Sequence, residues 1–349
     1  MFNRVLVPLD GSARAEHAIP IAARIARATG GSVLLLRVVR DDARRVWAPG
    51  APRTSAATCI ARQHSHASEY LAHITERDEL AEADTETVVA DGHAGAQIVS
   101  IARDRTLDLI VMCGRSRASL GRHVRSSVVE EVCRHAPMPV LVTSEDAPSA
   151  LQVDGRVVPA VSVFVPLDGS MRSESAVEPA MDLALALGGQ AHAALHLVRP
   201  VDMSLALRLS DESGDDAGAI YQDAVADARL YLARVVSRLR AGAAGELGMP
   251  IHIMTARGSD AGEALATATN TAHPAEESGF AQRYDIIAMA TGGRSGWGRW
   301  VRGNVRERVM RATRLPVLVV RSSDAASHDD RVKRDATAFS TAPWTMPLF

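Results

Sequence analysis

The stretch VLVPLDGSARAEHAIPIAARIARATGG at residues 5–31 returns as VFVPLDGSMRSESAVEPAMDLALALGG at residues 163–189. The identity is concentrated in the hexapeptide Val7–Ser12, which recurs unchanged at Val165–Ser170. Both copies close on a Gly-Gly pair. An internal repeat of this kind outweighs any local pattern, because each copy must fold as a related structural unit. The sequence therefore predicts two related domains.

The repeat continues through both halves of the chain. Two further pairs of segments match, 108–112 with 285–289 and 139–142 with 316–319. We expect one domain at 1–145 and a second at 159–322, joined by a polar linker at 146–158 that contains turn-forming residues. The segment 323–349 has no sustained hydrophobic period, and we expect a disordered tail there.

Each half alternates short apolar runs with stretches of helical spacing. In the first half five strands are expected, at 4–9, 33–39, 85–90, 109–112 and 140–143. Helices are expected between a capping Ser12 and Gly30, and at 55–78, 96–105 and 126–135. Fully apolar strands are typical of a parallel sheet that helices cover on both faces. The predicted fold class is α/β, with two tandem, doubly wound domains of five parallel strands each.

The fifth strands of the two halves, 140–143 and 317–321, are apolar and lie at sheet edges. Because unpaired apolar edges invite pairing, we expect them to join the domains as an intramolecular pseudo-dimer related by a pseudo-twofold axis. In parallel sheets, ligands bind beyond the carboxyl ends of the strands, where the strand order reverses. Asp10 and Asp168 directly follow the first strand of each half, and so mark two candidate sites.

The composition and net charge of the chain narrow the range of functions that it can have. The chain of 349 residues is 47% hydrophobic with a formal net charge of −2, which disfavours broad electrostatic binding to nucleic acid or membranes. Cys59, Cys113 and Cys133 have neither disulfide nor metal-binding spacing and suit a reducing compartment. We find no secretion signal and no apolar run of about 18 residues, so we expect a cytoplasmic protein. No catalytic or metal-ligating constellation stands out.

The ordered set of motifs resembles the universal stress protein family. The set comprises the Val-Pro-x-Asp-Gly-Ser opening, the Asp-Leu-Ile-Val-Met strand, a glycine-containing loop and the closing Pro-Val-Leu-Val strand, and it is found twice. The resemblance implies a Rossmann-like fold similar to that of adenine nucleotide alpha hydrolases. It also implies a stress-response or regulatory protein that binds ATP or another adenine nucleotide, with or without Mg²⁺ and without rapid turnover.

Nucleotide-binding members of that family carry the pattern G-x2-G-x9-G-[S/T] after the fourth strand. Backbone N–H groups of such a loop can line a phosphate chain, and the helix that follows favours anionic phosphate. The aligned positions in the second half are Ala290, Gly293, Gly303 and Asn304. Those in the first half are Cys113, Ser116, Ser126 and Ser127. Since glycine lets the backbone approach a ligand closely, the second domain is expected to bind nucleotide better.

The resemblance implies further that Asp10 and Asp168 lie against adenine or ribose. It places the backbone of Val38 and Leu197, near the end of each second strand, against adenine. The alternative for each aspartate is a turn residue that fixes its own backbone, and for each loop a plain tight turn. Arginines around the loops could grip phosphates or lie in solvent: 115, 117, 122, 125, 294, 299 and 302.

Three functions stay open at this point. The first is a nucleotide-binding regulatory protein, the second a slow ATPase or nucleotidyl-transfer enzyme, and the third an assembly module that pairs domains without binding nucleotide. The loops carry no carboxylate suited to hold Mg²⁺ for phosphoryl transfer, which favours binding over catalysis. Intramolecular pairing leaves room for a homodimer of whole chains.

Overall fold

The computed structural model describes most of both predicted domains. The described residues are 1–39, 53–114, 128–145, 147, 160–214, 216–258, 261–270, 273–274, 281–282, 284–291, 313 and 315–322. The predicted linker, apart from Ala147, and the predicted tail lie outside them.

One ten-stranded sheet runs through both halves, in the order β3-β2-β1-β4-β5-β12-β11-β6-β7-β8. The strands of the first half are β1 (Arg4–Leu9), β2 (Ser32–Val39), β3 (Asp84–Asp91), β4 (Leu109–Cys113) and β5 (Val140–Thr143). Those of the second half are β6 (Val161–Pro166), β7 (Ala193–Asp202), β8 (Ile251–Gly258), β11 (Ile286–Thr291) and β12 (Val317–Arg321). A small antiparallel pair joins β9 (His273–Pro274) to β10 (Ala281–Gln282). The five strands predicted for the first half are confirmed.

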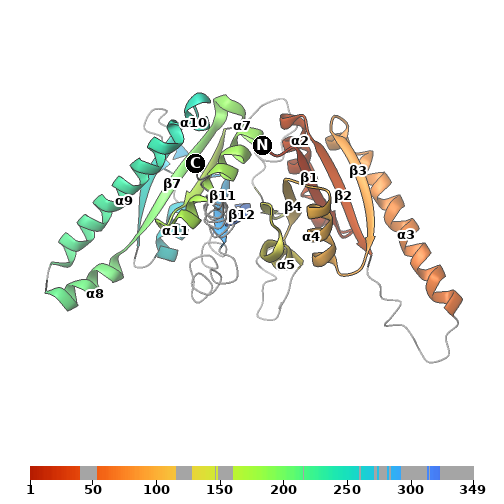
Figure 1. Ribbon diagram of the computed structural model, residues 1–349, viewed down its shortest axis with the longest axis horizontal. Coiled ribbons are helices and arrows are strands. Elements are labelled where there is room, and N and C mark those ends of the chain that lie inside the picture. Colours follow the sequence, from red (N-terminus) through yellow and green to blue (C-terminus); the bar gives the residue numbers. More distant parts are fainter. Residues whose placement is uncertain are drawn as a thin grey trace, which may run out of the picture.

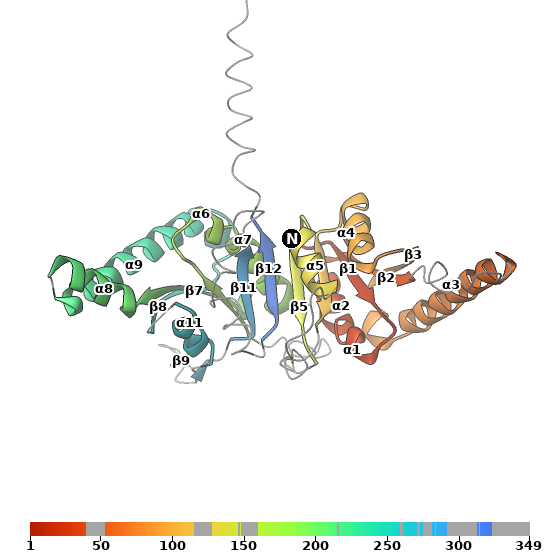
Figure 2. The ribbon, with the colours of Figure 1, turned by 90° about the horizontal axis from the view of Figure 1, so that it is seen from below.

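The two halves meet where β5 and β12 pair antiparallel, with Leu318 opposite Leu141 (Figure 2). All other neighbouring strands of the large sheet pair parallel. Within each half the order reverses at the first strand, β1 or β6, as a doubly wound fold requires. The fold class and the pairing of the fifth strands are therefore as predicted.

Helices cover both faces of the sheet. The helices of the first half are α1 (Ala13–Glu16), α2 (Ile19–Thr29), α3 (Arg53–Thr75), α4 (Ala94–Asp104) and α5 (Val128–His135), with a 3₁₀ turn at Asp78–Leu80. Those of the second half are α6 (Met171–Glu174), α7 (Val177–His192), α8 (Met203–Ser213), α9 (Ala217–Arg240), α10 (Ala243–Glu246) and α11 (Ala261–Asn270). The long helices α3 and α9 lie toward opposite ends of the molecule (Figure 1).

Two apolar cores, one on each face, run across the junction between the halves. On one face, side chains of α2, α3, α7 and α9 pack on the sheet, and on the other face those of α4, α5 and α11 do so. Leu141 of β5 and Leu318 of β12 belong to the same core. Because burial of apolar surface is the main favourable term in folding, both halves contribute to a shared stability.

The prediction of a single helix between Ser12 and Gly30 is wrong, because the structure has two helices there, α1 and α2. Ser12 caps α1 by accepting a hydrogen bond from the N–H of Ala15, and Gly30 ends α2 with a φ of 65°, both as predicted. Pro20 lies in the first turn of α2 and has no N–H, so the helical bond back to Glu16 cannot form. The second half breaks at the same place, between α6 and α7.

Candidate functional site

An Asp-Gly-Ser turn follows the central strand of each half at its carboxyl end. The Oδ1 atom of Asp10 accepts from the N–H of Ser12 at 3.0 Å and from the Ser12 hydroxyl. Asp168 Oδ1 accepts the same two bonds from Ser170, at 2.9 and 2.6 Å. Both aspartates fix their own turns and are exposed at the point where strand order reverses. The turn-fixing role is thus present, and it leaves the carboxylates facing solvent.

The surroundings of Asp10 favour the ionised form of its side chain over the protonated form. Burial of part of the side chain disfavours ionisation, but the two hydrogen bonds from Ser12 and the charges of Arg14 and Arg37 outweigh it. Together they hold the pKa of Asp10 below its ordinary value. The Arg14 guanidinium lies 3.2 Å from Asp10 Oδ2. An acceptor-only group is therefore present at this edge at neutral pH.

Beside each turn lies an Arg-Tyr-Glu-Arg cluster that sequence reasoning missed. Its members are Arg37, Tyr70, Glu16 and Arg77 in the first half, and Arg199, Tyr231, Glu174 and Arg238 in the second. The first arginine of each cluster lies over the tyrosine ring, 5.8 Å from the centroid in the first half and 4.8 Å in the second. The tyrosine hydroxyl donates to the glutamate at 2.9 and 2.8 Å, respectively.

The last arginine of each cluster pairs with the same glutamate. Arg77 Nη1 lies 2.9 Å from Glu16 Oε2, and Arg238 donates to Glu174 in the same way. Burial and the bond to glutamate raise the pKa of both tyrosines, which keeps their hydroxyls protonated as donors. A signal was available in the sequence, because Tyr-Leu-Ala-x4-Arg occurs at 70–77 and again at 231–238.

The clusters reach the turns through Arg37 and Arg199. Arg37 Nη1 donates to the carbonyl of Leu9 at 3.2 Å, directly before Asp10. Gly11 and Gly169 have φ values of 78° and 89°, which other residues rarely adopt. A Cβ on Gly169 would lie 2.1 Å from Arg199 Nη1, so any other residue in this turn would also displace the Arg199 guanidinium.

The strand register corrects the pairing of Val38 with Leu197. Leu35 lies opposite Val7, and Leu197 lies opposite Val165, so Leu197 is the counterpart of Leu35. Leu197 is fully buried, and its backbone lies within the ladder between β6 and β8. Pro200 takes the position of Val38 instead. Because proline has no N–H, the backbone there can only accept hydrogen bonds.

The structure places two of the predicted loop residues. Cys113 ends β4 opposite Thr143, and burial raises the pKa of its thiol to about 11. Ala290 lies in β11 opposite Val320 and is partly buried. The other predicted loop residues lie outside the described residues: Ser116, Ser126, Ser127, Gly293, Gly303 and Asn304, together with the seven arginines around the loops. Their role stays a prediction.

Within the described ranges, no three His, Cys, Asp or Glu side chains group closely enough to hold a metal ion. No helix in that part of the chain has both the length and the apolar character needed to cross a bilayer. Cys113 and Cys133 are not in disulfide bonds, and the side chain of Cys59 lies outside the described set.

Comparison with known proteins identifies the family. The model of the universal stress protein family matches residues 1–144 and 162–321. The chain belongs to the universal stress protein family. The two matched segments make it a tandem member, with one family domain in each half of the sheet. A search of curated proteins found no match.

Three solved structures of universal stress proteins are among those that this chain resembles. One from Archaeoglobus fulgidus is 20% identical with a TM-score of 0.56, covering 92% of this chain and 97% of that one. A putative universal stress protein from Pseudomonas aeruginosa is 15% identical with a TM-score of 0.49, covering 95% and 98%. A universal stress protein solved in complex with cAMP is 19% identical with a TM-score of 0.27, covering 41% and 97%.

Proposed function

We propose that this universal stress protein binds ATP or another adenine nucleotide at the carboxyl edge of its sheet, without rapid turnover, in a stress response. The observation that carries the proposal is the recurrence of an exposed Asp-Gly-Ser turn at both reversal points. The carboxylates of Asp10 and Asp168 can accept hydrogen bonds from a ribose hydroxyl or from the adenine amino group. The glycine beside each adopts the positive φ that the turn needs to hold its carboxylate at this edge.

The proposed binding is mainly through the second domain. Gly293 and Gly303 stand there where the first domain has Ser116 and Ser126, and a side chain at such a position obstructs phosphate. Pro200 keeps a carbonyl that can accept from the adenine amino group. An Mg²⁺ ion, where one is bound, would arrive with the nucleotide phosphates.

The first test is nucleotide analysis of the purified, heat-extracted protein, followed by calorimetry of the full chain with ATP, ADP, cAMP and GTP. Cyclic AMP is included because a family member was solved with it. We expect an adenine nucleotide in the extract, and adenine nucleotides to bind more tightly than GTP. No nucleotide in the extract together with no measurable binding of any of the four would refute the proposal.

Paired variants test the assignment to the second domain. Asp168→Ala should weaken ATP about tenfold or more, since a hydrogen bond to a charged group contributes roughly 1.5–3 kcal/mol, whereas Asp10→Ala should change it little. Gly303→Val should abolish binding without lowering the melting temperature, because its side chain would enter the phosphate position. Equal effects of the two aspartate variants would contradict the ranking.

An assembly role for the first domain is a second candidate, favoured by the pairing of β5 with β12 and by the serines in its loop. If the first domain serves only in assembly, the chain should be fully stable with no nucleotide bound to that domain. Phosphate release above background, abolished by Asp168→Ala, would instead establish the slow ATPase.

A further inference from the structure

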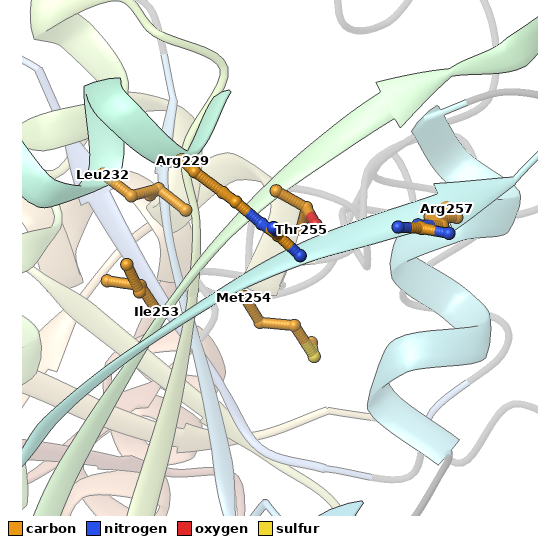
Figure 3. Close-up of a pocket in the computed structure, with 6 residues that line it drawn as sticks. All are labelled: Arg229, Leu232, Ile253, Met254, Thr255 and Arg257. Atoms are coloured by element: carbon orange, nitrogen blue, oxygen red, sulfur yellow. The ribbon is translucent and has the colours of Figure 1, made fainter. Parts of the chain in front are cut away.

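A pocket of about 290 Å³ lies between α9 and β8, which is the edge strand of the second half (Figure 3). Its lining includes none of the candidate nucleotide residues and consists of Arg229, Leu232, Ile253, Met254, Thr255 and Arg257. We propose that this pocket binds a phosphate monoester whose organic part is small and apolar. The pocket shares no residue with the proposed adenine nucleotide site, although Pro200 lies opposite Ala256, between Thr255 and Arg257.

Two guanidinium groups give the pocket its charge. Arg229 comes from α9 and extends across β8 toward Thr255, and Arg257 lies farther along the same strand (Figure 3). No carboxylate lines the pocket, and neither arginine pairs with a carboxylate among the described residues. Two positive charges that no nearby acid neutralises attract an anion to this surface.

The charge and donors match a phosphate better than a carboxylate. A phosphate monoester carries about −1.5 to −2 at neutral pH, which balances two arginines, and it has three oxygens that accept hydrogen bonds. The guanidinium groups can donate in pairs to those oxygens, and the Thr255 hydroxyl adds a further donor. A carboxylate has one charge and two oxygens, and so would leave part of this donor set unused.

The remaining wall of the pocket is apolar. Leu232 is fully buried and Ile253 is 44% exposed, whereas the side chain of Met254 is half-buried and packs against the core on the other face of the sheet. An exposed isoleucine on an edge strand gains from contact with an apolar ligand, because that contact removes apolar surface from water. The pocket therefore favours a small hydrocarbon or aromatic group attached to the phosphate.

The first domain lacks these features at the equivalent positions. The strand register places Val89 where β8 has Thr255 and Asp91 where it has Arg257. Alignment of Tyr70 with Tyr231 places Ser68 where α9 has Arg229. Asp91 Oδ1 lies 2.6 Å from His64 Nε2, so in the first domain the residue at this position is hydrogen-bonded to a neighbouring side chain. The shared fold therefore does not require the two arginines.

Calorimetry on the full chain with phenyl phosphate tests the site, with benzoate as the carboxylate of similar shape. We expect phenyl phosphate to bind, benzoate to bind at least tenfold more weakly, and Arg229→Gln and Arg257→Gln each to weaken phenyl phosphate about tenfold or more. The matched control is Arg234→Gln, which removes the same charge from an exposed position of α9 outside this pocket and should leave the affinity unchanged.

Asp168→Ala separates this site from the proposed nucleotide site. Phenyl phosphate affinity should persist in Asp168→Ala, and ATP affinity should persist in Arg229→Gln. The proposal is overturned if phenyl phosphate does not bind, if Arg234→Gln weakens it as much as the pocket variants do, or if benzoate binds as tightly. Circular dichroism melting of each variant verifies that a loss of affinity comes from folded protein.

Discussion

Single residues determine how the Asp-Gly-Ser turns are held. Gly11 and Gly169 both have positive φ values, but the space around them differs. A Cβ at Gly11 would lie 3.3 Å from the Arg37 guanidinium, where a small shift suffices, whereas at Gly169 it would lie 2.1 Å from Arg199 Nη1. Arg199 is also held against the Tyr231 ring, so its displacement costs a second contact.

We expect Gly169→Ala to lower the free energy of unfolding by about 1–2 kcal/mol from the positive φ alone, and further by displacing Arg199. Gly11→Ala has the same backbone strain without the severe overlap and is the matched control. Urea unfolding of both variants measures the difference. Equal losses would show that Arg199 moves aside at no cost.

A second residue, Asp285, makes stability depend on pH. Burial raises the pKa of its carboxyl from 3.8 to about 6, and the Ser162 N–H at 2.8 Å and the charge of Arg24 only partly oppose this. The folded chain therefore holds the proton more tightly than the unfolded chain. The stabilising contribution is complete below pH 3.8 and is lost as the pH rises through about 6.

Between pH 4 and pH 7, we expect the native protein to lose on the order of 2 kcal/mol of stability relative to Asp285→Asn. Urea unfolding across that range measures the difference at each pH. Asp108→Asn, at the equivalent position before β4, shows what the same replacement costs at another carboxylate that accepts from backbone N–H groups. A difference that does not vary with pH would refute the role of Asp285.

At the scale of elements, the Arg-Tyr-Glu-Arg clusters connect a long helix to the turn that carries each candidate aspartate. In the second half, Tyr231 and Arg238 of α9 contact Arg199 of β7 and Glu174 of α6. Three elements thus meet beside the Asp168 turn, and the same arrangement recurs with α3, β2 and α1. We infer that the clusters position the turns, since each contains an arginine directly beside the turn glycine.

Replacement of the cluster tyrosine separates its two contacts. Tyr231→Phe removes the hydroxyl, with its bond to the charged Glu174 and its hydrogen bond with Ser173, and should cost about 1.5–3 kcal/mol of stability. Tyr231→Leu also removes the ring beneath Arg199 and should cost roughly a further 0.5–1 kcal/mol. Tyr221→Phe is the control on the same helix, because the Tyr221 hydroxyl makes no hydrogen bond within the described part of the chain. The free energy of unfolding is measured with denaturant. If Tyr231→Phe and Tyr221→Phe lower it by the same amount, the cluster does not stabilise the fold as we expect.

At the scale of the whole molecule, two family domains behave as one sheet with two shared cores. Contacts across the junction are not symmetric, because Arg24 of α2 and Asp182 of α7 hold equivalent positions in the repeat with opposite charges. Arg24 donates to the carbonyl of Leu187, and Asp182 lies 2.7 Å from the amino group of Met1. These contacts favour pairing of the first domain with the second over pairing with its own copy.

We expect the halves to remain associated at micromolar concentration after cleavage between residues 146 and 156, because β5, β12, α2 and α7 bury a continuous apolar core. Insertion of a protease site in that segment and size-exclusion chromatography of the cut protein measure the association. Substitution of Leu141 by Asp, which places a charge in that core, is the control that should separate the halves. Dissociation of the cut native chain into folded monomers would refute the shared core.

The sequence by itself determined the tandem repeat, the alternation of strands and helices, and the pairing of the fifth strands. These features depend on local periodicity and on apolar edges, which short segments encode directly. Both Asp-Gly-Ser turns were predictable for the same reason. The break between α1 and α2 could have been predicted from Pro20, but helical spacing over the whole stretch concealed it.

Only the tertiary structure decided which distant residues meet. The cluster of Glu16, Arg37, Tyr70 and Arg77 draws on three separate segments, and the contact of Arg24 with Leu187 crosses the junction between the halves. The register made Pro200, and not Leu197, the counterpart of Val38, and the packing of α9 on β8 brought Arg229 and Arg257 to the same pocket. Such contacts depend on how faces of helices and strands pack together, and local patterns specify the faces without specifying their partners.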